Sequence, residues 1–464
     1  MDIKQEDTIC AIATPVGEGG IGLVKISGSG ASAIAQKLFQ PSLATFPLES
    51  HRLHYGRICD PASNQTVDEV LLSYMAAPRT YTREDVVEVN CHSGYAVLNR
   101  ILDLVLQAGA RLAEPGEFTR RAFLNGRLDL SQAEAVIDLI RSQSEQSLLH
   151  ANRVLQGGLS RQVQAWRECI LSLQAELEAA IDFCEDLEDE PADFLSMLQN
   201  LQEDLLHPLK EVLDHYEDGR ILREGFTVVL VGRPNVGKSS LLNALLRKNR
   251  AIVTPFPGTT RDVVEDSFIL SGILVRVLDT AGIRRRPDAI ESLGIERTFK
   301  SMEEADMVLW LIDASQPLTE EDDAVFGKIA SKRCVMLLNK VDLPQKVSVR
   351  QVQERFGGSA PILSLSVLNP HDVEKLRDFL TETCLRNPLA MGHSTIIPNL
   401  RHKSCLEQAL AALCRTRDLL QKGVYGELAS IELGIARHQL ESILGWVQDD
   451  EVLDRIFSQF CLGK

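Results

Sequence analysis

The sequence predicts a multi-domain α/β protein: an N-terminal α+β domain, an all-α helical domain, and a parallel sheet with crossover helices inserted into the helical domain. The first observation is the length, because 464 residues exceed what one hydrophobic core holds and fit about three domains. The second is a series of strand-like runs that alternate with helical segments over residues 221–384. The third is the helical spacing of apolar residues on both flanks, in 121–220 and 385–464.

The N-terminal segment, residues 1–120, mixes two patterns. Short β-branched runs such as TICAIAT, IGLVKIS and DVVEVN accompany one helical pattern, YAVLNRILDLVLQAG, which together predict an α+β unit. The series Gly17-Glu-Gly19-Gly-Ile-Gly22 has the form G-x-G-x-x-G. A dinucleotide-binding turn must open a helix, whereas a strand pattern follows here, so we expect a glycine-rich turn between two strands.

The two helical segments are expected to form one domain that the sheet interrupts. Ser131 followed by Glu134 predicts a capping box where the first segment turns helical. Residues 171–220 hold fifteen Asp and Glu against two basic residues, which accounts for most of the net charge of −16. Because the rest of the chain is nearly neutral, basic patches that bind RNA are not excluded.

Composition excludes several classes. Hydrophobic residues at 44% and charged residues at 25% are ordinary for a folded protein, and no window approaches the roughly 18 apolar residues of a membrane span. The N-terminus resembles neither a signal peptide nor a transit peptide, so we expect a cytoplasmic protein without membrane association. The ten cysteines form no C-x-x-C pair and predict reduced thiols. The pairs His51/His54 and Cys91/His92 lack a second spaced pair, which favours structural roles over a zinc site.

The strongest motif is Gly232-Arg-Pro-Asn-Val-Gly237-Lys238-Ser239, which follows a predicted strand and opens a helix. Its glycines let backbone N–H groups close around phosphates, Lys238 can reach the β and γ phosphates, and the Ser239 hydroxyl can bind Mg2+. The alternative is a glycine-containing turn with no ligand, which the preceding strand and the following helix make a poor fit. The expected nucleotide contacts in this loop are Asn235, Val236, Gly237, Lys238, Ser239 and Ser240.

Two further elements indicate that the nucleotide is GTP. Asp279-Thr280-Ala281-Gly282 ends one predicted strand, and Asn339-Lys340-Val-Asp342 ends another. The Asp342 carboxylate can accept two hydrogen bonds from guanine, and adenine has no matching donors. A further guanine contact is expected at Ser366-Val367-Leu368, where valine replaces the usual small residue. Three such motifs in order, each after a strand, resemble the Ras-like GTPase superfamily.

A loop between these motifs is expected to act as a switch. Thr254, Phe256, Thr259 and Thr260 lie in it, and Thr260 is positioned to bind Mg2+ when the γ phosphate is present. Ile283 stands where many small GTPases carry a glutamine that orients water. Asn235 and the threonine-rich loop are the pattern of GTPases that bind K+ and pair their G domains. Glu291 is the candidate for orienting water, with a solvated helix-start glutamate as the alternative.

Four stretches together resemble the MnmE (TrmE) family of tRNA-modification GTPases over essentially the whole chain. They are the G motifs with GTTRD, ATPVGEGGIGLVKISG at 13–28, EPGEFTRRAFLNGRLDLSQAEAV at 114–136, and the terminal IFSQFCLGK. From physics alone the tail FCLGK would be a frayed terminus. The resemblance instead makes it part of a binding site.

The resemblance implies a GTP-hydrolysing enzyme that modifies C5 of the wobble uridine of certain tRNAs. It adds an aminomethyl or carboxymethylaminomethyl group with an FAD- and NADH-using partner protein, in a heterotetramer-type complex. The N-terminal domain would form a homodimer and bind a tetrahydrofolate derivative, 5-formyl- or methylene-tetrahydrofolate. By motif match the implied residues are Lys25, Glu88, Arg127 and Lys464 for folate, Asn235, Thr254, Phe256 and Thr259 for K+, Ser239 and Thr260 for Mg2+, and Glu291 with Lys238 for catalysis.

The chain departs from the family pattern at two folate positions. The family often has Arg where this chain has Lys25, and Lys where it has Arg127, so charge is kept while donor geometry differs. Two other functions fit the sequence less well. A regulatory ribosome-assembly GTPase usually adds an RNA-binding module, which the sequence lacks. A stand-alone folate-dependent transferase would not need the intact G motifs.

Overall fold

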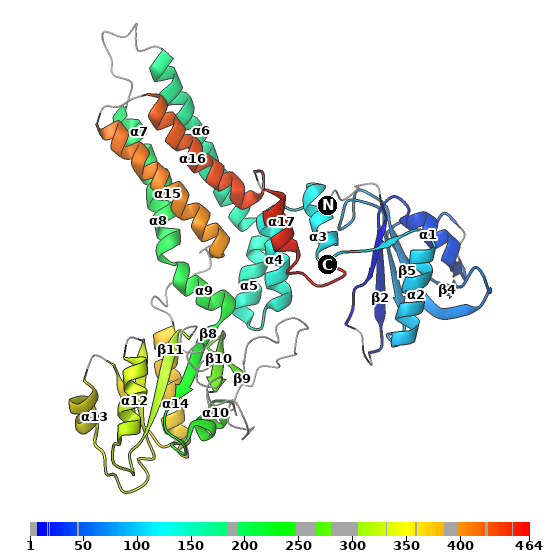
Figure 1. Cartoon of the computed structure of the whole chain (residues 1–464). Helices are drawn as coiled ribbons and strands as arrows, with labels where there is room; N and C mark the ends of the chain where they lie inside the picture. The colour runs from blue at the N-terminus through cyan, green and yellow to red at the C-terminus, as the bar shows by residue number, and fades with distance from the viewer. Residues whose placement is uncertain are drawn as a thin grey trace. The chain divides into compact units, whose positions relative to one another are not determined.

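The chain forms two compact units (Figure 1). The computed structural model describes residues 7–15, 17, 19–43, 46–182, 194–246, 266–279, 305–330, 332–357, 360–384, 397–422, 426–447 and 449–464, and for 180–182, 194 and 279 the backbone alone. The first unit holds 1–137, 154–205 and 408–464, and the second holds 138–153 and 206–407. The predicted division at 1–120, 121–220 with 385–464, and 221–384 stays a prediction.

The first unit begins with a seven-stranded sheet in the order β3-β4-β5-β6-β2-β1-β7. Neighbouring strands are antiparallel except β1 and β7. Helices α1 (Ala31–Leu38) and α2 (Tyr95–Gln107) contact the sheet and share its apolar core. The strands are β1 (Ile9–Ile12), β2 (Gly22–Ser27), β3 (Phe39–Pro41), β4 (Arg52–Cys59), β5 (Thr66–Met75), β6 (Val86–Cys91) and β7 (Arg111–Leu112).

The glycine series at 17–22 joins two antiparallel strands, β1 and β2. Ile12 pairs with Val24; Gly17, Gly19 and Gly20 lie between the strands, and Gly22 begins β2. The expectation of a glycine-rich turn instead of a dinucleotide-binding loop is therefore confirmed.

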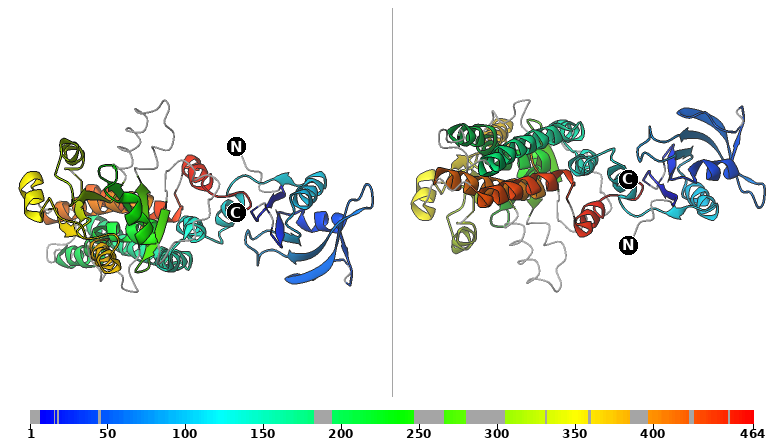
Figure 2. Two further views of the ribbon diagram at one scale, coloured as in Figure 1. Left: turned by 90° about the horizontal axis from the view of Figure 1, so that it is seen from below. Right: turned by 90° about the horizontal axis from the view of Figure 1, so that it is seen from above.

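Helices complete the first unit. Figures 1 and 2 show α6 (Gly158–Asp182) lying along α16 (Glu427–Leu444), and the two share the most extensive helix–helix contact of the chain's described part. Val163, Trp166, Ile170, Leu173 and Leu177 recur every three or four residues and are buried, as an apolar helix stripe requires. The remaining helices are α3 (Glu117–Leu124), α4 (Leu130–Arg141), α7 (Phe194–Asn200), the π-helical stretch η1 (Leu201–Leu206), α15 (Leu400–Gln421) and α17 (Asp450–Phe457), of which α4, η1 and α15 belong in part to the second unit.

The predicted cap of α4 was wrong by two residues. Asp129, and not Ser131, caps this helix: its carboxylate accepts from the Gln132 N–H, and the Gln132 side chain accepts from the Asp129 N–H at 3.0 Å. Ser131 lies inside the first turn and donates its hydroxyl to Asp129 at 2.6 Å. The D-x-x-Q pattern that begins at Asp129 forms the cap because an ionised carboxylate is a stronger acceptor than a hydroxyl for the free N–H groups of the first turn.

The second unit is built on a six-stranded sheet in the order β13-β12-β11-β8-β10-β9. All neighbours are parallel except β9 and β10, which agrees with the predicted parallel sheet and crossover helices. Its strands are β8 (Phe226–Val231), β9 (Asp266–Leu270), β10 (Ile273–Asp279), β11 (Met307–Asp313), β12 (Cys334–Asn339) and β13 (Ile362–Ser364). Its helices are α5 (Glu145–Leu155, which ends in the first unit), α8 (His207–Asp214), α9 (Tyr216–Glu224), α10 (Lys238–Leu246), α12 (Glu320–Ile329), α13 (Val349–Phe356) and α14 (Pro370–Cys384).

Both faces of this second sheet are covered. Every residue of β11 is buried, and two apolar clusters divide the side chains of the central strands between them. Strands that are buried on both faces have continuous apolar sequences. The runs MVLWLID and CVMLLN therefore predicted strands from the sequence alone. Within the described ranges, no helix combines the length and apolar character needed to cross a membrane.

Candidate functional site

The glycine motif of the second unit forms the loop between β8 and the N-terminus of α10, as predicted. Gly237 has φ +107°, and a Cβ there would lie 2.5 Å from the Asn339 Nδ2 atom, so no other residue fits this turn. The Lys238 Nζ atom donates to the backbone carbonyls of Gly232 at 2.7 Å and Arg233 at 2.8 Å. Ser239 and Ser240 are exposed on the first turn of α10. This is the arrangement of a phosphate-binding loop.

The second and third motifs meet this loop at the carboxyl edge of the sheet. Asn339 is buried, donates to the Val236 carbonyl at 2.8 Å, and accepts from the Val367 N–H at 3.2 Å. One side chain thus ties the loop of 339–342 to the phosphate loop and to residues 366–368. Asp342 is exposed, as a carboxylate that receives guanine must be. Val367 and Leu368 follow the buried Ser366, whose hydroxyl accepts from the Leu368 N–H at 3.3 Å.

Lys340 also links the loop of 339–342 to the phosphate loop, through contacts of its own. Its Nζ atom donates to the Asn235 carbonyl at 2.8 Å and to the Asp313 carboxylate at 2.6 Å. Burial raises the pKa of Asp313, but hydrogen bonds from Lys340 and Ser315 outweigh burial and hold the pKa below its usual value. Asp313 was not among the predicted site residues, although it ends the run MVLWLID at the same sheet edge, which is a signal for a site residue.

A second cluster of candidate residues lies in the first unit. The Lys25 Nζ atom is 3.7 Å from the Glu88 carboxylate, which faces it from the neighbouring strand β6. The same ammonium lies 4.8 Å from the ring centroid of Tyr81 and 5.3 Å from that of Phe118. The Arg127 guanidinium stacks on the Tyr81 ring at 4.7 Å. Tyr81 and Phe118 were not foreseen, because neither follows a periodic pattern that marks a site.

The C-terminal tail reaches this cluster and is not frayed. Gly463 is buried with φ +88°, and a Cβ there would lie 2.8 Å from the Ile12 carbonyl, so the tail packs closely on the end of β1. Burial lowers the pKa of Lys25, Glu88 opposes this effect, and the positive charges of Lys464 and Arg127 add to the lowering. The structure therefore brings together Lys25, Glu88 and Arg127, and the charge of Lys464 acts on Lys25 from the tail.

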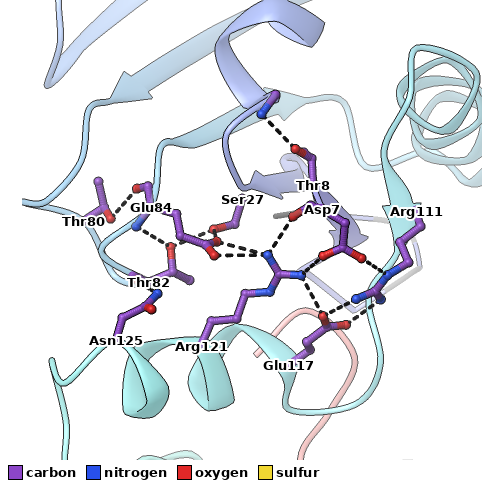
Figure 3. Close-up of polar contacts among 11 residues, drawn as sticks. Asp7, Thr8, Ser27, Thr80, Thr82, Glu84, Arg111, Glu117, Arg121 and Asn125 are labelled. Atoms are coloured by element: carbon purple, nitrogen blue, oxygen red, sulfur yellow. Dashed lines mark hydrogen bonds and ion pairs between the residues drawn. The ribbon is translucent and has the colours of Figure 1, made fainter. Parts of the chain in front are cut away.

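A buried ion network in the same unit is centred on Arg121 (Figure 3). Arg121 on α3 is 3% exposed and donates to Asp7 at 2.6 Å, to Glu117 at 3.0 Å and to Glu84 at 3.1 Å. Arg111 forms a bidentate ion pair with Glu117, with hydrogen bonds of 2.6 and 2.8 Å. Burial raises the pKa of Glu117, but the two arginines and the Glu114 N–H outweigh burial, so this pKa lies below its usual value.

The network fixes the loop that carries Tyr81. Ser27 donates to Glu84 at 2.7 Å, and Asn125 donates to the Thr82 carbonyl at 2.7 Å. The Tyr81 and Thr119 hydroxyls lie 2.9 Å apart, which joins the ring to α3. Strand β2, the loop 80–84 and helix α3 are thus held in one arrangement beside Lys25.

Comparison with known proteins decides the family. The family profile described as "GTP-binding protein TrmE N-terminus" matches residues 8–127, and that described as "MnmE helical domain" matches 130–461. A protein of Syntrophobacter fumaroxidans named "tRNA modification GTPase MnmE" is 60% identical over 462 residues, covering 99% of this chain and 98% of the relative. The protein of that name from Carboxydothermus hydrogenoformans is 47% identical, covering 99% of this chain and 100% of the relative.

The chain belongs to the MnmE (TrmE) family. Among solved structures, the G domain of the T. maritima FeoB iron transporter is similar to part of the chain, with a TM-score of 0.27 and 23% identity, covering 34% of this chain and 97% of that one.

Several residues predicted from the G motifs or implied by the MnmE resemblance lie outside the described residues: Thr254, Phe256, Thr259, Thr260, Thr280, Ala281, Gly282, Ile283 and Glu291. Asp279 ends β10, as the motif requires, with its backbone alone described. Of the pairs weighed as zinc ligands, Cys91 is buried and donates to the Gly22 carbonyl at 3.4 Å, and His92 pairs with Asp68 at 2.8 Å. The described residues contain no group of three or more His, Cys, Asp or Glu suited to a metal ion.

Proposed function

We propose that this protein hydrolyses GTP to drive modification of the wobble uridine of certain tRNAs. A tetrahydrofolate derivative supplies the carbon, and an FAD- and NADH-using partner completes the aminomethyl or carboxymethylaminomethyl group at C5. Membership of the MnmE family, whose relatives are named tRNA modification GTPases, supports the GTPase and tRNA parts of this proposal. We propose a cytoplasmic location for the reaction.

The observation that carries the folate part is the cluster around Lys25. Three cations, Lys25, Arg127 and Lys464, meet one carboxylate and two aromatic rings within one unit. A folate combines a flat heteroaromatic ring with anionic carboxylates, so the rings suit stacking and the cations suit its charge. The bound derivative would supply the one-carbon unit. Glu88 opposes the lowering of the Lys25 pKa by burial and adds a hydrogen-bond acceptor beside the ammonium.

The nucleotide part rests on the three joined loops of the second unit. Lys238 and the N–H groups of the phosphate loop would hold the phosphates, and Asp342 would select guanine. The exposed hydroxyl of Ser239 and the exposed side chain of Asn235 offer oxygen donors that fit Mg2+ and K+ respectively. These ions would neutralise negative charge on the phosphates, with Thr260, Thr254, Phe256 and Thr259 proposed as further ligands and Glu291 as the residue that orients water.

Self-association is proposed through the first unit. The paired strands β4 and β5 leave Leu53, Tyr55 and Leu71 between 44% and 64% exposed, and Tyr55 is directly opposite Leu71. Apolar side chains gathered on one sheet face favour burial against a second copy. The proposed assembly is a homodimer that binds the redox partner in a heterotetramer-type complex.

Titration calorimetry with 5-formyl-tetrahydrofolate tests the folate assignment directly. The wild-type chain should bind this ligand, and Lys25→Ala should bind it at least about tenfold more weakly, since a buried charged contact is lost. Lys37→Ala, which removes a lysine of the same unit on the exposed last turn of α1, serves as the control. Equal affinity of the wild type and Lys25→Ala would refute the assignment.

A further inference from the structure

A second pocket of the first unit shares a side chain with the Lys25 cluster. Its volume is about 550 Å³. The turn between α3 and α4, the end of α16 and helix α17 enclose it, and Figure 1 shows α17 against α3 and α4. It is lined by Phe123, Leu124, Gly126, Arg127, Leu128, Asp129, Gln132, Leu444, Gly445, Trp446 and Leu453. A volume of this size holds one nucleotide-sized group.

One wall of the pocket is an exposed indole held in place. Trp446 is 51% exposed, and the Arg167 guanidinium lies 5.1 Å from its ring centroid. Glu441 fixes that guanidinium by accepting from its Nε atom at 2.8 Å. Gly445 lets this end of α16 approach Phe123, because a Cβ at Gly445 would lie 2.9 Å from the Phe123 ring. A half-exposed aromatic side chain that is kept rigid is a surface on which a nucleobase stacks.

Arg127 connects the pocket to the Lys25 cluster. It lines the pocket and also stacks on Tyr81, so groups bound on its two sides are separated by a single side chain. Arg127 is exposed, and its Nη1 atom donates a long hydrogen bond, 3.3 Å, to the Tyr81 carbonyl. A guanidinium has five N–H donors, so Arg127 retains donors for a base carbonyl or a phosphate.

The polar wall of the pocket is preorganised. The Asp129 carboxylate accepts from Ser131, Gln132 and Ser160, and Gln132 is fixed at both ends of its amide. Each carboxylate oxygen has two lone pairs, so Asp129 can still accept from a ring N–H. A uracil has one ring N–H between two carbonyls, which matches an acceptor beside the donor Arg127. Arg83, whose Nη1 atom donates to the Asn125 carbonyl at 2.8 Å, adds a cation near Gly126 at the rim.

We propose that this pocket binds the target uridine of the RNA, extruded from its loop, beside the one-carbon carrier. The inference rests on the proposed function and adds to it the place of the second substrate. An aromatic wall, an acceptor beside a donor, and rim cations are the groups by which proteins hold an unstacked base and its phosphates. The shared Arg127 gives the proximity that transfer of a one-carbon unit between two bound molecules requires.

Binding of an unmodified tRNA anticodon stem-loop to the full-length chain, followed by fluorescence anisotropy, tests the proposal. Trp446→Ala should weaken binding about tenfold, as loss of one base-stacking ring does, and Trp446→Phe should restore most of it. Tyr95→Ala is the matched control, because Tyr95 is 72% exposed on α2 and does not line the pocket. Circular dichroism of each variant reports its folding. A stem-loop with 4-thiouridine at the wobble position should crosslink to peptides containing 123–132 or 444–453.

The outcomes separate this inference from the proposed function. If the wild type binds 5-formyl-tetrahydrofolate and the stem-loop, and Trp446→Ala binds both equally well, the pocket assignment is wrong while the function stands. If Trp446→Ala keeps its RNA affinity but loses the redox partner, the pocket is a protein-docking surface and the inference is also wrong. A wild-type chain that binds neither ligand overturns the function and the pocket together. Retained folate affinity with weakened RNA binding in Trp446→Ala supports the proposal.

Discussion

His150 makes the second unit sensitive to acid. This residue of α5 is 5% exposed, and burial, together with the positive charges of Arg223, Arg153 and His402, lowers its pKa from 6.5 to about 4. In the unfolded chain the imidazole regains its ordinary pKa, so below about pH 6.5 the unfolded state binds a proton that the folded state rejects. The stability linked to neutral His150 is therefore complete above pH 6.5 and is lost as the pH falls towards 4.

The size of the effect follows from the two pKa values. A shift from 6.5 to about 4 corresponds to about 3 kcal/mol in full, at about 1.4 kcal/mol for each pH unit. Between pH 7 and pH 5, proton linkage gives a loss of about 2 kcal/mol from this one residue. His150→Gln, which does not titrate, should remove that part of the pH dependence and leave the rest.

Urea unfolding read by pulsed hydrogen–deuterium exchange of peptides from the second unit measures this difference. The free energy of unfolding of the wild type should fall by about 2 kcal/mol more than that of His150→Gln when the pH changes from 7 to 5. His371→Gln, at an exposed histidine of α14, is the control and should behave as the wild type. Equal pH dependence of the wild type and His150→Gln would refute the reasoning.

Four further predictions concern the two sites. Gly237→Ala should weaken GTP binding about tenfold or more in a nucleotide-binding titration, because its Cβ meets Asn339, whereas Gly327→Ala, which meets nothing within 4 Å, should not. Asp342→Asn should bind GTP more weakly and xanthosine triphosphate more tightly, and unchanged selectivity would contradict the guanine assignment. Replacing K+ by Na+ should slow GTP hydrolysis with little change in binding, and equal rates would exclude the proposed ion. Arg121→Met should lower the unfolding free energy of the first unit by about 3–5 kcal/mol, since three carboxylates lose a buried partner, and a smaller loss in thermal unfolding would contradict this.

The nucleotide loops were predictable because their signals are local. The run FTVVLVG, the glycine spacing and the helix after Lys238 sit within a few residues of each other, and β8 and α10 form there. Asn339 ends β12 and Ser366 comes shortly after the end of β13, and parallel strands bring their carboxyl ends to one edge. The valine at 367 departs from the usual motif, so the sequence alone did not align this loop with the site. The hydrogen bond from the Val367 N–H to the Asn339 side chain places the loop there.

The support of the Lys25 cluster was not predictable, because it joins residues far apart in the sequence. Arg121 meets Asp7 and Glu84, which no spacing rule connects to it. Tyr81 is likewise brought to Lys25 by the network and not by a motif. The α4 cap shows a different limit: two overlapping patterns, at Asp129 and Ser131, both fit the rule, and the strength of the acceptor decides between them.

The tail shows what the family resemblance adds to physical reasoning from sequence. A terminal FCLGK has too few apolar residues to predict that it packs, yet Phe460 is buried and Gly463 lies against β1. The contact depends on the absence of a side chain at Gly463, which composition does not reveal. Deletion of 461–464 should spare GTP hydrolysis, whose motifs lie in the other unit, and should weaken binding of 5-formyl-tetrahydrofolate in calorimetry. Unchanged folate affinity would remove Lys464 from the proposed site.

Mass spectrometry of tRNA wobble uridines tests the central claim most directly. Cells that lack this protein would receive the wild-type chain, Lys25→Ala, or no chain, with GTP hydrolysis of both purified proteins measured alongside. We predict aminomethyl or carboxymethylaminomethyl uridine with the wild type alone, while Lys25→Ala still hydrolyses GTP because Lys25 lies outside the nucleotide loops. Full modification by Lys25→Ala, or unmodified uridine in cells with the wild type, would contradict the account.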